Sequence, residues 1–359
     1  MNVSDLGWNK FFEDNFIEYK EQGFIPARVS EEHKNNYRLF SEYGELFAEI
    51  SGKYRFNVES RGQLPTVGDW VAITHIPAES KGIINALLPR KSAFERKVAG
   101  ETTVEQVVAS NVDIVFIVSG LDHNYNIRRI ERYLTLGWES GAMPVVVLNK
   151  AGLCENIDEV SAEVTAIAIG VPIHVTSARD GSGFEIFHQY LERGKTGAFL
   201  GSSGVGKSSI INFLTGSKDL PTQEVRDYDS RGRHTTTYRQ LIMLPSGGIV
   251  IDTPGMRLLK LWGDDEGIKR VFEEIEELAA SCRFRDCKHV EEPGCAVQTA
   301  ISDGRLARDR YDSYLKLRKE QRYLEARQSM KASAVEKLRW KMIARYQKDL
   351  KKRGSERNR

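Results

Sequence analysis

The 359-residue sequence lacks the features of membrane proteins and of secreted disulfide scaffolds. No apolar run approaches the roughly 18 residues that a membrane-spanning helix needs, and the first residues lack the apolar core of a signal peptide. Four cysteines are too few for a disulfide framework in a chain of this length. We therefore expect a cytoplasmic protein without a membrane partner.

The net charge of +2 conceals an asymmetry along the chain. Residues 301–359 contain 19 lysines and arginines but only 8 acidic residues, whereas residues 1–300 carry a net charge of −9. Tyrosines and a tryptophan are interspersed with the basic residues, a composition suited to phosphate contacts and base stacking. We expect this basic tail to meet a polyanion, and the alternative is a solvated charged helix.

The patterning divides the chain into four segments. Residues 1–36 show no clear period, and we interpret them as an N-terminal lead-in. Residues 37–104 carry short alternating apolar stretches between turn signals, which predicts a small antiparallel β-barrel or sandwich. Residues 105–265 alternate compact apolar strands with helical segments, the pattern of a doubly wound parallel α/β sheet. Residues 266–359 are predicted to be helical and contain three of the four cysteines.

The strongest motif is a phosphate-binding loop of the form G-x-x-x-x-G-K-[ST], between a predicted strand and a predicted helix. The loop and the residue after it are Gly201, Ser202, Ser203, Gly204, Val205, Gly206, Lys207, Ser208 and Ser209. Its backbone N–H groups should surround the phosphates of a nucleotide. Lys207 should reach the outer phosphate oxygens, and Ser208 should ligate Mg²⁺.

Two further segments complete the predicted magnesium and phosphate site. Asp252-Thr-Pro-Gly255 follows a predicted strand, where P-loop enzymes place an aspartate for Mg²⁺ and a glycine whose N–H senses the terminal phosphate. The polar segment 232–237 lies between the two motifs and predicts a switch loop whose Thr236 reaches the metal. An ordinary exposed loop is the alternative for that segment.

Two short motifs indicate a base-binding site. Asn149-Lys150 and Ser177-Ala178 each end a predicted strand. In guanine-nucleotide enzymes, N-K-x-D and S-A motifs hold the base, and the aspartate accepts hydrogen bonds from guanine. Here both motifs precede the phosphate loop, whereas in an ordinary GTPase they follow it. The set of parts is complete but its order is rotated, as in a circular permutation.

The clustered cysteines predict a metal site. Cys282, Cys287, His289 and Cys295 form a Cys₃His set, which is closed, has soft ligands and favours structural Zn²⁺ over a catalytic ion. Unligated buried cysteines are the alternative. Cys154 is left over, and we interpret it as a small buried side chain.

The rotated motif order, the barrel before it and the Cys₃His cluster after it strongly resemble the circularly permuted GTPases of the RsgA family, also called YjeQ or YloQ, which act on the bacterial small ribosomal subunit. The motifs that carry the resemblance lie within about residues 37–300: residues 65–70, 106–113, 149–150, 201–209, 232–237, 252–255 and 282–297. The resemblance implies an OB-fold that binds rRNA, a central GTPase domain that takes GTP or GDP with Mg²⁺, and a zinc domain that also contacts the ribosome. It further implies late assembly of the small subunit as the function, with turnover stimulated by that subunit. Nothing in the sequence argues for an oligomer, and we expect a monomer.

The base-binding stretch departs from the family pattern. It reads Asn149-Lys150-Ala151-Gly152, so Gly152 stands where the family has aspartate. The missing carboxylate removes roughly 1.5 to 3 kcal/mol for each hydrogen bond to a charged acceptor. Glu155 or Asp158 is the alternative acceptor. Two alternative functions follow: an NTPase of relaxed base choice, and an RNA-binding assembly factor with a degenerate nucleotide site.

The residues for hydrolysis also differ from those of Ras-type enzymes, which orient the attacking water with a glutamine after the DxxG glycine. Met256 occupies that position and cannot polarise water, so we expect slow intrinsic turnover. The resemblance implies that His234 is catalytic, and we place Lys207 of the phosphate loop and Thr236 of the switch loop in the catalytic set with it. The alternative is a histidine that only shapes the switch loop.

Overall fold

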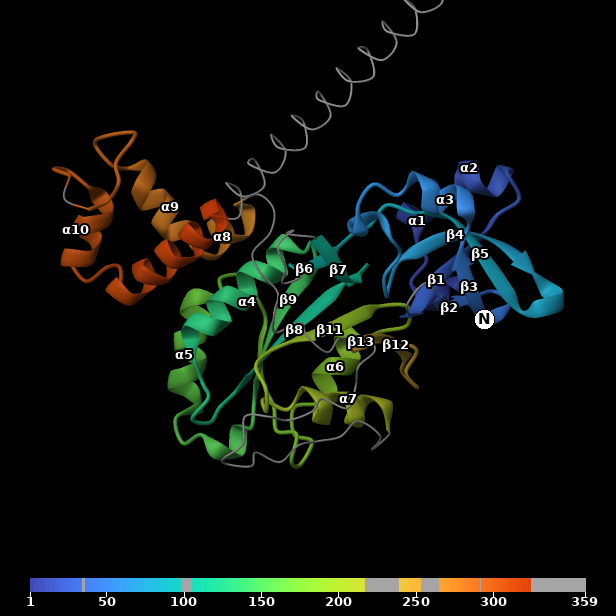
Figure 1. Ribbon diagram of the computed structural model, residues 1–359. Coiled ribbons are helices and arrows are strands. Elements are labelled where there is room, and N and C mark those ends of the chain that lie inside the picture. Colours follow the sequence, from blue (N-terminus) through green and yellow to red (C-terminus); the bar gives the residue numbers. More distant parts are fainter. Residues whose placement is uncertain (34–35, 98–104, 217–238, 253–264, 291, 324–359) are drawn as a thin grey trace, which may run out of the picture. The chain divides into compact units, whose positions relative to one another are not determined.

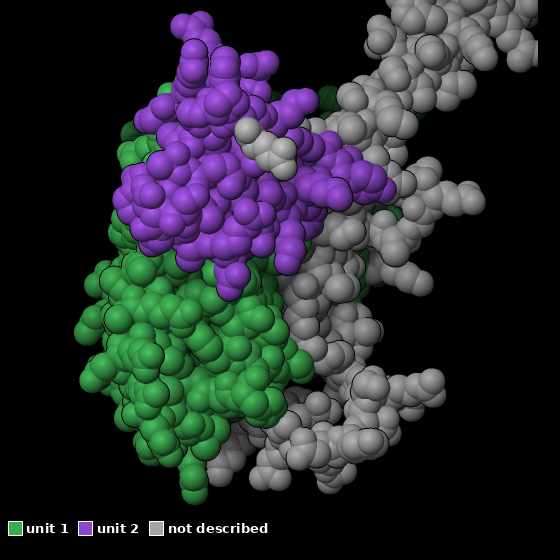
Figure 2. Space-filling view, turned by 90° about the vertical axis from the view of Figure 1, so that its left-hand side faces the viewer, with its two compact units in different colours: residues 1–280 green, residues 281–359 purple. Residues whose placement is uncertain are grey.

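The computed structural model describes residues 1–33, 36–97, 105–216, 239–252, 265–290 and 292–323. The chain forms two compact units, residues 1–280 and residues 281–359 (Figure 2). Within the described residues, no helix combines the length and the apolar character needed to cross a membrane.

The first unit contains a closed five-stranded barrel, which confirms the barrel expected from the sequence. Its strands are β1 (Ile25–Glu32), β2 (Asn36–Ser41), β3 (Gly44–Ile50), β4 (Trp70–Ile76) and β5 (Lys81–Leu87). They pair in the order β1-β2-β3-β5-β4, and β4 pairs again with β1, so the barrel closes. Every pair is antiparallel except β3 with β5. This is a five-stranded barrel of the OB type.

The barrel includes a strand that precedes residue 37, where its start was predicted. β1 lies in the segment interpreted as a lead-in, and residues 27–30 are buried without interruption. Ala27 and Val29 face the barrel core, while Arg28 is buried on the other side of the strand. Because both faces are covered, β1 lacks the two-residue alternation by which a half-exposed strand is found.

Short helical segments surround the barrel. Before β1 lie η1 (Val3–Leu6), α1 (Lys10–Asp14) and α2 (Ile17–Glu21), and between its strands lie α3 (Gly52–Asn57), η2 (Arg61–Gln63) and η3 (Pro77–Glu79). Leu6, Phe12 and Phe16 pack in one cluster with Trp70 of β4. The N-terminal segment therefore forms part of the core.

The central sheet confirms the expected α/β architecture. Its strands are β8 (Ile114–Gly120), β9 (Met143–Asn149), β10 (Ile173–Val175), β11 (Thr196–Leu200), β12 (Gln240–Met243) and β13 (Ile249–Asp252). They are ordered β10-β9-β8-β11-β13-β12, with all neighbours parallel except β12 with β13. A separate ribbon pairs β6 (Ala93–Lys97) with β7 (Glu105–Ser110).

Helices cover both faces of the sheet (Figure 1). They are α4 (Ile127–Glu139), α5 (Ile157–Ile167), α6 (Glu185–Tyr190) and α7 (Lys207–Thr215). A short 3₁₀ helix, η4 (Ala151–Leu153), follows β9. Phe116 of β8 packs with residues of α6 and α7 in one apolar cluster. On the other face, Gly137 of α4 lies so close that a Cβ there would be 3.2 Å from Val115. Because both faces are covered, every residue of β8 is buried.

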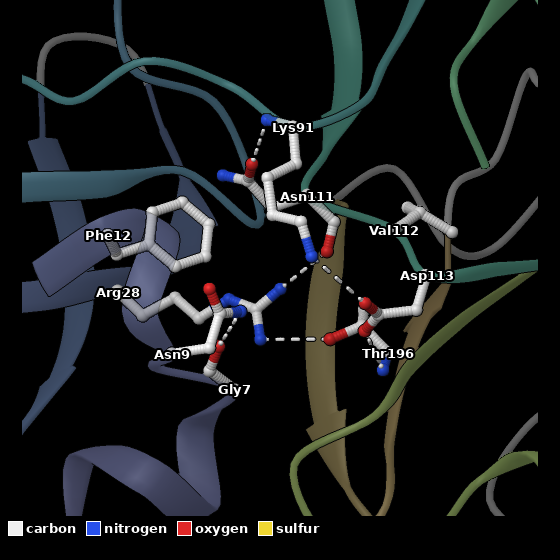
Figure 3. Close-up of a pocket in the computed structure, with 9 residues that line it drawn as sticks. All are labelled: Gly7, Asn9, Phe12, Arg28, Lys91, Asn111, Val112, Asp113 and Thr196. Atoms are coloured by element: carbon white, nitrogen blue, oxygen red, sulfur yellow. Dashed lines mark hydrogen bonds and ion pairs between the residues drawn. The ribbon is translucent and has the colours of Figure 1, made fainter. Parts of the chain in front are cut away.

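A buried arginine joins the barrel to the sheet (Figure 3). Arg28 is 1% exposed, and it donates to Thr196 Oγ1 over 2.9 Å, to the Asn111 carbonyl over 3.0 Å, and to the carbonyls of Leu6 and Gly68. Burial lowers the pKa of Arg28 to about 10. The space beside it is about 10 Å³, room for a single water at most. Thr196 opens β11, so this contact ties the barrel to the strand that carries the phosphate loop.

Helices complete both units. The first unit ends with α8 (Glu266–Val271) and α9 (Glu273–Ala280). The guanidinium carbon of Arg270 in α8 lies 3.5 Å from the ring centroid of Trp138 in α4. The second unit contains α10 (Ala296–Ser302) and a helix over residues 308–323. Residues 324–359, the larger part of the basic tail, lie outside the described residues.

Candidate nucleotide site and metal cluster

The phosphate loop connects β11 to α7, as the motif predicted. Gly201 and Gly206 have φ angles of +155° and +102°, where side chains are disfavoured. A Cβ at Gly206 would lie 2.2 Å from Asn149 Nδ2, and one at Gly201 would lie 2.4 Å from the Val118 carbonyl. The backbone path therefore requires glycine at both fixed glycine positions of the motif.

The charged residues of the two phosphate motifs interact electrostatically. Lys207 Nζ donates to the carbonyls of Gly201 over 2.8 Å and Ser202 over 2.6 Å. Asp252 ends β13, the neighbour of β11 in the sheet. Burial raises the pKa of Asp252, and the positive charge of Lys207 acts in the opposite direction. The Asp252 carboxylate and the hydroxyl of Ser208, an exposed residue on the first turn of α7, are hard oxygen donors that fit Mg²⁺.

Asn149 connects three segments of the predicted site. Its side chain is fully buried, and Nδ2 donates to the Val205 carbonyl of the phosphate loop over 2.7 Å. Its Oδ1 accepts from the Ala178 N–H over 3.1 Å and from Thr176 Oγ1 over 3.3 Å. The structure thus brings together the base motifs and the phosphate loop, although they are far apart in the chain.

The base side has one position with open space around it. Ala151 N–H donates to the Thr176 carbonyl over 3.1 Å, and the neighbouring Ser177 is buried. Gly152 is exposed, and a Cβ built on it would meet no atom within 4 Å. The position where the family has a carboxylate therefore has room for a side chain.

The loop after β8 and the first turn of α4 contribute residues that the sequence motifs did not reveal. Asp122 Oδ2 lies 2.6 Å from Lys150 Nζ, and Asn124 and Arg129 both bind Ser202 of the phosphate loop. Burial opposes ionisation of Asp122, but the bond from Lys150 and the Asn124 N–H outweigh it and hold its pKa below the usual range. The sheet order explains the placement, because β8 lies between β9 and β11 and its carboxyl end meets both motif loops.

Several predicted site residues lie outside the described part of the chain. They are His234 and Thr236 of the predicted switch loop, and Gly255 with the adjacent Met256. The expectations about water activation and about the terminal phosphate sensor remain predictions.

The four predicted metal ligands converge in the second unit. The ligand atoms of Cys282, Cys287, His289 and Cys295 all lie within 4.8 Å of one another. Cys282 Sγ and Cys295 Sγ are 3.9 Å apart, and each lies 3.5 Å from His289 Nδ1. A tetrahedral ion with Zn–S bonds of about 2.3 Å and a Zn–N bond of about 2.0 Å needs edges of about 3.8 and 3.5 Å. The donor set therefore fits a tetrahedral metal.

Local structure supports these ligands. Burial opposes ionisation of Cys282, but the N–H groups of Val297 and Ala296 outweigh it and lower its pKa. His289 adopts a φ of +57°, and its carbonyl accepts from Gln298 Nε2 over 2.5 Å. An anchored histidine is a feature of a preformed metal site.

Comparisons with known proteins agree with this geometry. A family model described as RsgA GTPase matches residues 87–262. The small ribosomal subunit biogenesis GTPases RsgA of Opitutus terrae and Syntrophotalea carbinolica are 45% and 43% identical to this chain, each over 97% of both proteins. Among solved structures, YjeQ from Thermotoga maritima has a TM-score of 0.61 at 32% identity, covering 82% of this chain and 97% of its own. YloQ, titled a circularly permuted GTPase, has a TM-score of 0.58 at 25% identity, over 82% of this chain and 93% of its own. These matches confirm the resemblance that the motifs indicated.

Proposed function

Because this chain belongs to the RsgA GTPase family, we propose that it hydrolyses GTP while bound to the small ribosomal subunit and assists late assembly of that subunit. The named relatives are small ribosomal subunit biogenesis GTPases. The structural observation that supports hydrolysis best is the preformed site around Asn149. One buried amide holds the base motifs and the phosphate loop together despite their permuted order.

The residues of the site have distinct proposed roles. The N–H groups of the phosphate loop bind the phosphates, and Lys207 exchanges the carbonyls of Gly201 and Ser202 for phosphate oxygens. Ser208 and Asp252 hold Mg²⁺, which neutralises charge on the triphosphate. Thr236 completes the metal site, and His234 orients the water. Asn149, Lys150, Ala151, Gly152, Ser177 and Ala178 form the base side, and Gly255 senses the terminal phosphate.

The other segments supply the contacts with the ribosome in this proposal. The closed barrel is of the OB type, which commonly binds oligonucleotides, and we assign it to rRNA. The basic tail adds phosphate contacts. The protein acts as a monomer in the cytoplasm, where ribosomal subunits are assembled.

The Cys₃His cluster is a structural zinc site in this proposal. Three thiolates and one imidazole leave no open position for a substrate. We expect one zinc per chain by elemental analysis, and Cys287→Ser should release it and lower the unfolding temperature. A purified full-length protein with no bound zinc and unchanged stability after chelation would contradict this assignment.

Phosphate release from GTP and from ATP tests the function, with and without small ribosomal subunits. We expect slow release from GTP alone, at least tenfold stimulation by subunits, and loss of both in Lys207→Ala. Stimulation with either nucleotide would establish the NTPase of relaxed base choice, which Gly152 favours. Subunit binding without any turnover would instead establish the RNA-binding factor with a degenerate site.

A further inference from the structure

A single loop contacts both ends of the nucleotide site. Residues 121–126 follow β8, and Asp122 of this loop binds Lys150 on the base side. On the phosphate side, Asn124 Nδ2 donates to Ser202 Oγ over 3.1 Å and to the Ser203 carbonyl over 3.4 Å. None of the family motifs in the sequence includes this loop.

Arg129 extends the same contacts with a positive charge. It lies in the first turn of α4, and its NH1 group donates to Ser202 Oγ over 3.0 Å and to Asn124 Oδ1 over 2.9 Å. A further bond reaches the Asn124 carbonyl over 3.3 Å. Asn124 therefore fixes the direction of the guanidinium, and both side chains hold the second residue of the phosphate loop.

The charge of Arg129 is not neutralised within the described part of the chain. All its partners there are neutral oxygens, and no carboxylate lies within ion-pair distance. The neighbouring Arg128, by contrast, is paired with Glu131. A guanidinium with unused N–H donors beside a phosphate loop is suited to an anion, because arginine matches phosphate oxygens in charge and geometry.

We propose that Arg129 is a positioning residue that makes this site prefer nucleoside triphosphate over diphosphate. It acts by placing a positive charge beside the phosphate loop, and its bonds to Ser202 and Asn124 hold the guanidinium there. The terminal phosphate adds negative charge to the ligand, so a nearby cation stabilises the triphosphate complex more than the diphosphate complex. This inference rests on the proposed function, since it assumes that residues 201–208 bind a nucleotide.

The test compares affinities for GDP and for a non-hydrolysable GTP analogue in the full-length protein. Arg129→Gln keeps the length and removes the charge, and it should reduce the preference for the analogue about five- to tenfold. Its GDP affinity should change less than twofold, which also shows that the variant is folded. Arg129→Lys should retain most of the preference, because the charge stays. Arg55→Gln is the matched control, because Arg55 is an exposed arginine of α3 that is far in the chain from the nucleotide motifs.

Each outcome decides the proposal. Equal losses of GDP and analogue affinity in Arg129→Gln would show that the arginine only maintains the loop, and the proposal would be wrong. A preference as high as in Arg55→Gln would overturn it as well. Asn124→Ala should reproduce part of the loss, because it releases the guanidinium. Ribosomal subunits are absent from these measurements, so a failure of subunit stimulation would affect the proposed function and leave this test intact.

Discussion

The two ends of the nucleotide site are built in different ways. The phosphate end is held by several close contacts: a Cβ at Gly201 or Gly206 would meet the Val118 carbonyl or the Asn149 side chain, and three side chains are bonded to the loop. The base end has an open position at Gly152, where an added Cβ would meet no atom within 4 Å. Phosphate binding therefore depends on a preformed arrangement, whereas base selectivity depends on single side chains. Substitutions at the first end should remove activity, and those at the second should change which nucleotide is used.

The largest effect is expected from Lys207→Ala at the phosphate end. Removing the ammonium leaves the charge that develops on the transferred phosphoryl group without its nearest cation, so the rate of GTP hydrolysis should fall about 10³-fold. Single-turnover phosphate release measures this change. Retention of more than a tenth of the rate would mean that another cation carries the role.

Asn149→Ala should affect both ends at once. It leaves the Val205 carbonyl and the Ala178 N–H without their buried partner, at a cost of about 1 to 3 kcal/mol for each group. We expect affinities for GDP and GTP to fall together, about 100-fold, in equilibrium titrations. Asn85→Ala removes a partly buried amide of the barrel that binds Thr74, and it should leave both affinities unchanged. Unaltered GDP binding in Asn149→Ala would contradict the connecting role.

Gly152→Asp should increase base selectivity, because it adds to the base end the carboxylate that this chain lacks. Open space surrounds the position, so the new carboxylate can accept hydrogen bonds from guanine without displacing a neighbour. We expect the preference for GTP over ATP to rise at least tenfold in competition assays, given about 1.5 to 3 kcal/mol for each such bond.

The control for that variant is Gly52→Asp, which adds the same charge at an equally open position of α3. It should leave nucleotide preference unchanged. If Gly152→Asp also has no effect, another residue already supplies the acceptor, and Glu155 and Asp158 are the first to substitute.

The sequence revealed the parts of the two sites whose residues lie at short, fixed spacings along the chain. The phosphate loop, Asn149 and the Cys₃His set were all found from spacing, and the structure brings each set together. Asn124 and Arg129 were missed because their role arises from strand order, which places the end of β8 between two motif loops. Strand β1 was missed for a related reason, since burial on both faces removed the alternation that marks a strand.

The smallest effect is expected at the Asp122–Lys150 ion pair of the base end. The carboxylate has a lowered pKa in the folded protein, so its stabilising contribution is present above about 3.8, its ordinary value, and is lost as the pH falls through the lower folded value. Asp122→Asn should therefore destabilise the protein by about 1 kcal/mol at pH 7. The difference from the unmodified protein should shrink as the pH falls below about 3.8.

Urea unfolding across this pH range measures the effect, with Glu79→Gln as the control for an exposed pair. That control should show no difference at any pH, because both partners of the Glu79–Lys81 pair are more than half exposed. A constant difference for Asp122→Asn across the range would show that the stabilisation does not come from ionisation of the Asp122 carboxylate. Since the Asp122 carboxylate accepts hydrogen bonds from Lys150 and from the Asn124 N–H, whereas Asn149 bonds directly to the phosphate loop, GDP affinity should change less in Asp122→Asn than in Asn149→Ala. The site would then tolerate the loss of the Asp122 carboxylate, which bonds to the base end alone, better than the loss of the Asn149 amide, which bonds to both ends.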